Sequence, residues 1–113
     1  MKIDYIEFGS KDIKASKRFF ESAFNWTFVD FGPDYSAFTK QGLVGGLYTT
    51  SKVATSEQGG ALVVLQGDDL ESTLLAVEAA GGIITKPIFA FPGGERFQFV
   101  EPGGNELAVW RKV

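Results

Sequence analysis

The sequence predicts an α+β protein made of two βαβββ modules, whose strands form a curved mixed β-sheet cleft with the helices outside. Two observations lead to this fold class. First, the order of a strand, a helix and three strands joined by tight turns occurs twice along the 113 residues. Second, the copies keep the same spacing, since Tyr5 and Leu62 each lie seven residues before an aspartate, Asp12 and Asp69. A repeat of about 57 residues indicates an internal duplication.

The first module is expected over about residues 1–50. Side chains alternate between two faces over residues 3–8, which predicts a strand covered on both sides. Ser10 can cap a helix over residues 11–24, which Asn25 ends. The Gly45–Gly46 pair indicates a bulge or a close approach to the backbone. Three further strands, rich in aromatic and β-branched residues, are predicted over residues 26–31, 35–39 and 43–50.

Polar and small residues fill positions 51–60, which have the composition of a surface connection between modules. The second module is expected over about 61–113, within one domain of 1–113. It begins with a short strand at 61–65. A helix follows from the capping-box-like pair Asp68 and Glu71 and stops at Gly81–Gly82. The rest is predicted as a strand that begins at 83–85, a loop over 87–94 and two strands within 96–110. Alternation assigns Phe97, Phe99, Leu107 and Val109 to the apolar face of these last two strands.

Composition limits the function classes. A net charge of -3 gives no general attraction to nucleic acid, and no apolar run could span a membrane. The first residues have a strand pattern and no signal-peptide pattern, so a cytoplasmic location is expected. Without cysteine there is no disulfide or thiolate nucleophile. Without histidine there is no Ser-His-Asp catalysis, and any metal would need oxygen ligands alone.

Two stretches carry a family resemblance. Residues 5–26, YIEFGSKDIKASKRFFESAFNW, resemble the opening module of the vicinal oxygen chelate superfamily, the glyoxalase, bleomycin-resistance and ring-cleaving dioxygenase group. Residues 97–107, FQFVEPGGNEL, are similar to that group's closing hairpin, whose usual turn is Asp-Pro-Asp-Gly-Asn. Glu101 and Gly103 depart from this turn. The resemblance covers nearly the whole chain and implies the fold of the group.

The resemblance does not extend to a metal site. Metal-dependent members of the group place His or Glu at one inward position on each of four strands. The matching positions here hold Tyr5, Gly46, Leu62 and Ala108. An alignment shifted by two residues would bring Glu7 and Glu106 into the first and last places, but two carboxylates alone hold a divalent ion weakly. The resemblance therefore implies no metal and no cofactor.

Glu7 and Glu106 are the candidate catalytic residues. They share a face with the positions that the resemblance points into the cleft. A carboxylate there could act as a general base, or, when ionised, bind a cationic ligand. The alternative is that each is solvated at a strand end or paired with Arg96 or Lys2.

Other side chains of this face are candidate ligand contacts. Gln98 could orient a ligand by hydrogen bonding, or it could be an exposed polar group of a strand. Amphipathic aromatic rings often line ligand pockets. The expected ligand-binding set is Tyr5, Glu7, Tyr48, Gln98, Glu106 and Trp110.

Two functions remain open. The first is a metal-free homodimeric binding protein that holds an aromatic or cationic molecule in the cleft, as resistance proteins of the group sequester drugs. The second is a lyase or isomerase of the glyoxalase-like group with Glu7 or Glu106 as base, with or without an oxygen-ligated divalent ion. In both cases the partner is a small molecule, and neither nucleic acid nor membrane is expected.

Overall fold

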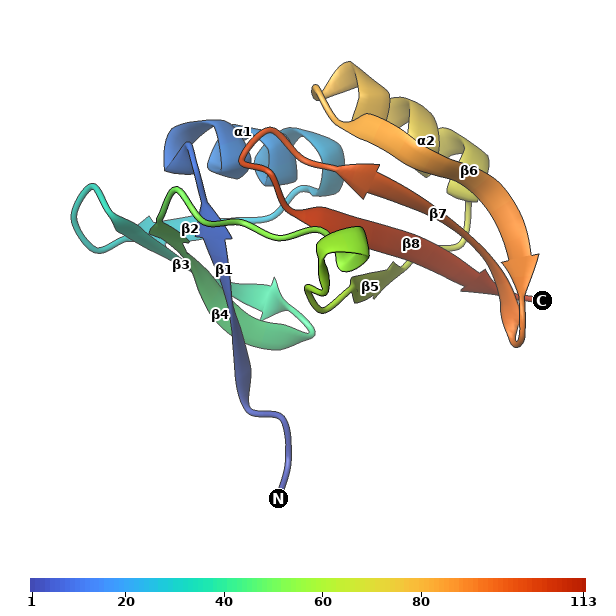
Figure 1. Cartoon of the computed structure of the whole chain (residues 1–113), viewed down its shortest axis with the longest axis horizontal. Coiled ribbons are helices and arrows are strands. Elements are labelled where there is room, and N and C mark those ends of the chain that lie inside the picture. Colours follow the sequence, from blue (N-terminus) through green and yellow to red (C-terminus); the bar gives the residue numbers. More distant parts are fainter.

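Two four-stranded mixed sheets with two helices form the computed structural model, which describes residues 1–113 (Figure 1). The strand order is β1-β4-β3-β2 in the first sheet and β5-β8-β7-β6 in the second. In each sheet one parallel pair, β1 with β4 or β5 with β8, joins antiparallel neighbours. The duplicated βαβββ architecture is confirmed.

The elements follow in the same order in both halves. The first sheet contains β1 (Tyr5–Ser10), β2 (Phe28–Asp30), β3 (Tyr35–Gln41) and β4 (Leu43–Thr49). The second contains β5 (Val63–Gln66), β6 (Ile83–Phe91), β7 (Gly94–Val100) and β8 (Glu106–Lys112). The helices are α1 (Ile13–Phe24), α2 (Leu70–Ala79) and the short 3₁₀ helix η1 (Ser56–Gln58). Neither α-helix is long and apolar enough to cross a membrane.

The helices begin later than the sequence predicts. Asp12, not Ser10, caps α1, since its carboxylate accepts a hydrogen bond from the backbone N–H of Ala15 at 3.1 Å. Ser10 is the last residue of β1, where it pairs with β4, so its backbone belongs to the sheet. Asp69, not Asp68, caps α2 and accepts from the N–H of Ser72 at 3.0 Å. In both helices the cap is the aspartate that recurs in the repeat.

The predicted loop over 87–94 is wrong. The chain continues as β6 through Phe91, and only the turn before Gly94 separates it from β7. Proline is rare inside strands because it has no N–H to donate to the sheet. Pro87, however, lies on the edge strand of its sheet, between Lys86 and Phe89, where the pairing with β7 is irregular. A proline is tolerated at such a position because no ladder hydrogen bond requires its nitrogen.

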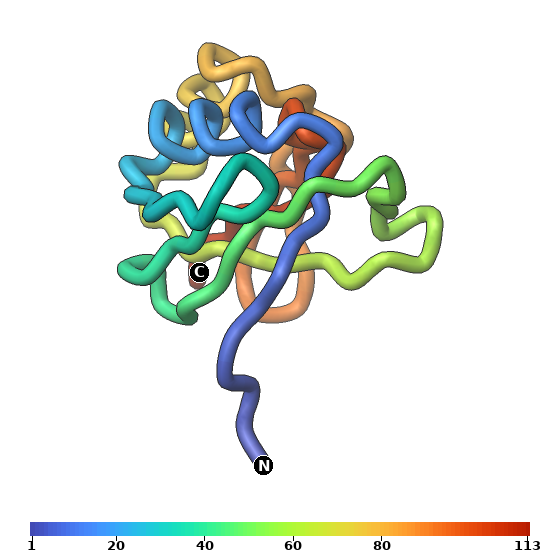
Figure 2. The backbone as a smooth tube through the Cα atoms, turned by 90° about the vertical axis from the view of Figure 1, so that its left-hand side faces the viewer, coloured from blue at the N-terminus to red at the C-terminus, as the bar shows by residue number.

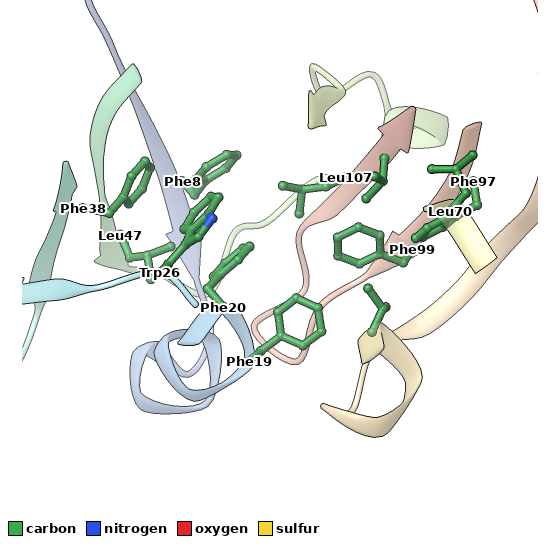
Figure 3. Packing of buried hydrophobic residues seen from close by; sticks show 12 residues of the cluster. Phe8, Phe19, Phe20, Trp26, Phe38, Leu47, Leu70, Phe97, Phe99 and Leu107 are labelled. Atoms are coloured by element: carbon green, nitrogen blue, oxygen red, sulfur yellow. The ribbon is translucent and has the colours of Figure 1, made fainter. Parts of the chain in front are cut away.

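One hydrophobic core extends through both modules and lies between the sheets and the helices (Figure 3). The face of the last hairpin that alternation assigns to the core is buried as predicted, at Phe97, Phe99, Leu107 and Val109. Phe19 of α1 contacts Phe99 of β7, with ring centroids 5.6 Å apart. The core is therefore shared by the two modules.

The turn between β7 and β8 also joins the modules. The Glu101 carboxylate accepts hydrogen bonds from the backbone N–H of Gly103 at 2.9 Å and from the Asn105 side chain at 3.0 Å. The Gly103 carbonyl accepts from the N–H of Lys11 at 3.0 Å. This turn thus lies on the junction between β1 and α1, whereas the connection between β4 and β5 loops away from the body (Figure 2).

Candidate functional site

Glu7 lies on the face of the first sheet that points away from the helices, because it alternates with the core residue Phe8. Its Oε1 accepts hydrogen bonds from the Tyr5 hydroxyl at 2.6 Å and from the Tyr35 hydroxyl at 3.2 Å. Gly46 pairs with Glu7 across β1 and β4. A Cβ at Gly46 would collide with the Tyr35 ring, so the close approach predicted for the glycine pair exists.

Contact with Glu7 contributes to a raised pKa of both tyrosines. The hydrogen bond to Glu7 raises the pKa of Tyr5 to about 12. Burial, and then the hydrogen bond to Glu7, raises the pKa of Tyr35. Tyr48 lies opposite Tyr35 in the pairing of β3 with β4. Tyr5 is 49% exposed and Tyr48 41% exposed, so this face presents a carboxylate among accessible aromatic rings.

Glu106 on the second sheet has a different environment. Its Oε1 accepts from the backbone N–H of Ser56 at 2.9 Å and from the Ser56 hydroxyl. Its Oε2 accepts from the Thr85 hydroxyl at 2.9 Å and the Gln98 amide at 3.3 Å. Burial acts to raise the pKa of Glu106, but these hydrogen bonds outweigh burial and hold the pKa below its ordinary value. Both carboxylate oxygens accept hydrogen bonds, and those from Ser56 hold η1 against β8.

The structure therefore corrects one alternative drawn from the sequence. Neither Glu7 nor Glu106 forms an ion pair with Arg96 or Lys2; the neighbours of both carboxylates are neutral donors. Gln98 is only 2% exposed, so it is a buried donor to Glu106 and not an exposed strand residue.

The remaining aromatic candidate, Trp110, lies at the far end of the second sheet. It pairs with Arg96 across β7 and β8 and contacts Phe91 edge-on, with centroids 6.1 Å apart. The Arg96 guanidinium lies over the Phe89 and Phe91 rings, at 5.2 and 4.8 Å from their centroids. The structure thus brings the candidates together in two groups, one on each sheet, and no hydrogen bond or ion pair links the groups.

Two residues of these groups, Tyr35 and Ser56, were not predicted from the sequence. Tyr35 could have been found, because strand parity places it on the same face as Tyr48. Ser56 could not, since it lies in the connection between modules and is 50 residues from its partner Glu106.

A family model described as the Glyoxalase/Bleomycin resistance protein/Dioxygenase superfamily matches residues 2–109. The chain belongs to this superfamily. It is also 29% identical over 126 residues to "Anthracycline biosynthesis protein DnrV" of Streptomyces peucetius, an alignment that covers 96% of this chain. The chain spans 46% of the length of DnrV.

Solved structures of the superfamily share the fold. A glyoxalase-related enzyme from Fulvimarina pelagi superposes with a TM-score of 0.81 and 22% identity, covering 99% of this chain and 88% of that one. A glyoxalase/bleomycin resistance protein/dioxygenase family enzyme from Burkholderia phytofirmans PsJN gives 0.81 and 14%, covering 98% and 100%. At these identities the likeness concerns the fold alone.

The residues at the metal positions of the superfamily do not fit a metal ion. Tyr5, Gly46, Leu62 and Ala108 offer one phenol oxygen and no carboxylate or imidazole. The shifted alignment supplies Glu7 on one sheet and Glu106, already saturated, on the other. Nowhere in the chain do three His, Cys, Asp or Glu side chains come together as a ligand set. The side chains at these positions therefore do not make a metal centre.

Two hollows of the chain lie between the modules, lined by residues of both. Their volumes are about 470 and 150 Å³. Both are lined by Trp26, Gln41, Val64 and Leu65, and neither is lined by any of the six candidate ligand contacts. The smaller hollow is below the range of roughly 300–1,000 Å³ that is usual for small-molecule pockets. The six candidate ligand contacts therefore lie on the faces of the two sheets and outside these two hollows.

Proposed function

We propose that this superfamily member binds a small aromatic or cationic molecule without a metal and without catalysing its conversion. The observation that carries the proposal is the Tyr5–Glu7–Tyr35 arrangement on the open face of the first sheet. It combines one negative charge with aromatic rings, which are the two groups that bind an organic cation.

The arrangement leaves part of Glu7 for a ligand. Both tyrosine hydroxyls donate to Oε1, and Oε2 has no hydrogen-bond partner. A ligand ammonium can bind Oε2 while its carbon atoms contact the rings of Tyr5 and Tyr48. Cation–π contacts of this kind are worth about 0.5–2 kcal/mol each.

The other predicted contacts belong to the second sheet. Trp110 is the proposed aromatic contact there, whereas Gln98 and Glu106 shape this wall by holding η1 against β8. The name of DnrV supports the inclusion of an anthracycline among the ligands tested.

A homodimer is part of the proposal. Apolar side chains are exposed on the open face of the first sheet, including Val29 at 57% and Val44 at 47%. A second copy packed on these side chains would also enclose the ligand site, because Val44 pairs with Tyr5 on the same face, so the dimer would complete the pocket. Sedimentation velocity would contradict this part if the protein remained monomeric at tens of micromolar.

No specific observation favours a lyase or isomerase. Glu106 accepts four hydrogen bonds and has a lowered pKa, so it is a poor general base. Glu7 has one free oxygen but no second acid or base beside it other than two tyrosines with raised pKa values.

The experiment compares benzyltrimethylammonium, benzyl alcohol and an anthracycline by thermal shift and isothermal titration. Binding of the cation is expected to weaken about tenfold in Glu7→Gln, the value of one ion contact near 1.4 kcal/mol. Glu21→Gln removes the same charge from an exposed position of α1 and should change nothing. Equal binding of benzyl alcohol, or an unaffected Glu7→Gln, would contradict the proposed site.

Native mass spectrometry tests the metal-free part separately. After incubation with magnesium, manganese, nickel or zinc and removal of excess ion, no stoichiometric metal is expected. One tightly held ion per chain would overturn this part of the proposal.

A further inference from the structure

Arg96 is held by aromatic rings and by no acid. Its guanidinium lies 5.2 Å from the Phe89 centroid and 4.8 Å from the Phe91 centroid. Its Nε is fully buried and has no hydrogen-bond partner, the one such buried side-chain nitrogen or oxygen in the chain. The terminal nitrogens also make no hydrogen bond, and part of their surface is exposed to solvent.

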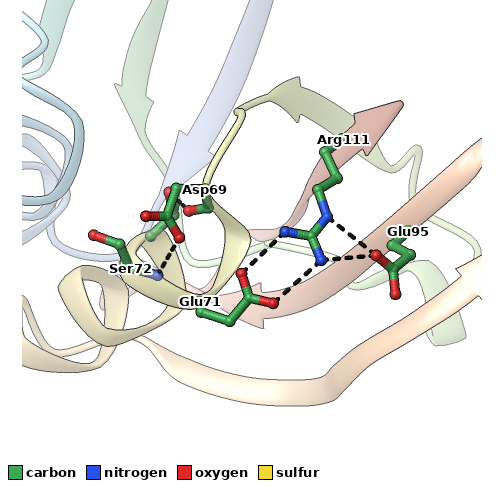
Figure 4. A network of polar contacts seen from close by, with 6 residues as sticks. Asp69, Glu71, Ser72, Glu95 and Arg111 are labelled. Carbon is green, nitrogen blue, oxygen red and sulfur yellow. Dashed lines mark hydrogen bonds and ion pairs between the residues drawn. The ribbon is translucent and has the colours of Figure 1, made fainter. Parts of the chain in front are cut away.

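Arg111, on the same sheet, differs from Arg96 because it is paired with acidic side chains. It lies on the opposite face and bonds Glu71 at 3.0 and 3.2 Å and Glu95 at 2.7 Å (Figure 4). Two carboxylates thus neutralise Arg111, whereas Arg96 has none. A guanidinium fork without an acid partner is suited to bind a carboxylate in bidentate geometry.

The surroundings of Arg96 add to this positive charge. The Lys86 ammonium lies 5.9 Å from the centroid of the same Phe89 ring and forms no ion pair. The acid of this face, Glu106, already accepts hydrogen bonds on both oxygens. Two cations therefore share one ring, and neither forms an ion pair with a carboxylate.

We propose that Arg96 binds the carboxylate of an aromatic acid. The terminal nitrogens of Arg96 take the two carboxylate oxygens, and the aromatic ring of the ligand contacts Trp110, which lies opposite Arg96 in the sheet. Phe89 and Phe91 fix the plane of the guanidinium, so that little side-chain freedom is lost on binding.

This site goes beyond the proposed cation site. It lies on the second sheet and selects the opposite charge. Failure of either site would leave the other standing, since Glu7→Gln tests the first and Arg96 variants test the second.

The test is a titration with sodium benzoate, followed by the indole N–H resonance of Trp110 and, in the natural sequence, by the Nε–H resonance of Arg96. The Trp26 indole, which lines the two hollows between the modules, would shift if benzoate bound there instead. Saturable shifts are expected at Trp110 and Arg96. Arg96→Gln should weaken benzoate binding at least tenfold, and benzamide, which has the same shape without the charge, should bind at least tenfold more weakly than benzoate.

Two further variants make the result decisive. Arg18→Gln removes one positive charge from an exposed position of α1 and should leave benzoate binding within twofold. Arg96→Lys keeps the charge but loses the fork, and should bind benzoate at least threefold more weakly; it decides the matter if Arg96→Gln does not fold. Absence of saturable shifts, equal binding of benzamide, or full binding by either Arg96 variant would overturn the site.

Discussion

The side-chain amide of Asn105 donates a hydrogen bond to the backbone carbonyl of Gly9 at 2.7 Å. The two residues are 96 positions apart in the sequence. Asn105 directly precedes the last strand and Gly9 lies near the end of the first, so this bond connects the two modules at the turn between β7 and β8.

Asn105→Ala should destabilise the protein by about 2 kcal/mol, since it removes the donor of the partly buried Gly9 carbonyl and a second, buried bond to Glu101. Urea unfolding measures the loss. Asn105→Asp should cost more at neutral pH, because it places a carboxylate beside that of Glu101, and should recover part of the loss on acidification. A loss below about 0.5 kcal/mol for Asn105→Ala would show that the bond contributes little.

Gly103→Ala should be strongly destabilising, by roughly 3 kcal/mol, because the added methyl group would collide with the buried hydroxyls of Ser10 and Ser16. Gly67→Ala is the matched control. Its Cβ would approach a methyl group of Val109 at 3.2 Å, which is far less close than the approach at Gly103, so a cost below about 1 kcal/mol is expected. Similar losses for the two variants, in thermal unfolding, would argue against close packing at this turn.

Glu106→Gln should lower the free energy of unfolding by about 2 kcal/mol at neutral pH, since an amide nitrogen would face hydrogen-bond donors. The same substitution should release η1, so that the connection over residues 51–60 is cut faster by protease. Thr55→Ala, which alters the cap of η1 but not the tie to β8, should have a smaller effect on cleavage.

The pH dependence of stability checks the charge of Glu106. Because its folded pKa is lowered, its stabilising contribution is present above the unfolded value near 4.5 and is lost as the pH falls through the folded pKa. Asp30 and Glu71 also have lowered pKa values and remain in both proteins. The difference in unfolding free energy between the natural protein and Glu106→Gln should therefore shrink on acidification below about pH 4.5. A difference independent of pH would contradict an ionised Glu106.

Tyrosinate absorbance tests the ties to Glu7. In a Tyr48→Phe background only Tyr5 and Tyr35 titrate. Tyr5 is expected to ionise near pH 12, and Glu7→Gln should bring its pKa back toward 10.0. Because the folded pKa is raised, the associated stabilisation is complete below pH 10.0 and is lost as the pH rises toward 12. An unchanged titration in Glu7→Gln would show that the hydrogen bonds do not persist in solution.

The sequence was sufficient for the fold, because the clues to it are periodic. Alternation identified the buried face of the last hairpin at Phe97, Phe99, Leu107 and Val109, and the repeat identified two modules. Local rules failed where tertiary structure overrode them. Pro87 suggested a loop, but an irregular edge strand accommodates it. Ser10 was predicted as the N-cap of the first helix, but its backbone is paired with Thr49 in the sheet.

The candidate site was less predictable, since its contacts are not local. Parity placed Glu7 and Glu106 on their faces, but it gave no information about their partners. The hydrogen bonds of Glu106 to Ser56 and Thr85 join residues 50 and 21 positions away. Phe89 and Phe91 lie over Arg96 because β6 continues through both residues. The sequence predicted a loop there because of Pro87. Only the folded chain distinguishes a satisfied carboxylate from an available one.

The register of the two parallel strand pairs has an evolutionary consequence. Glu7 pairs with Gly46 in the first module, and Val64 pairs with Ala108 at the corresponding place in the second. All strands of one sheet come from the same module, so the backbone hydrogen bonds of a sheet stay within its module. A substitution on one sheet therefore leaves the strand pairing of the other sheet intact. Duplication thus gave this chain two walls that can acquire different chemistry independently, one with a partly free carboxylate at Glu7 and one with an unpaired guanidinium at Arg96.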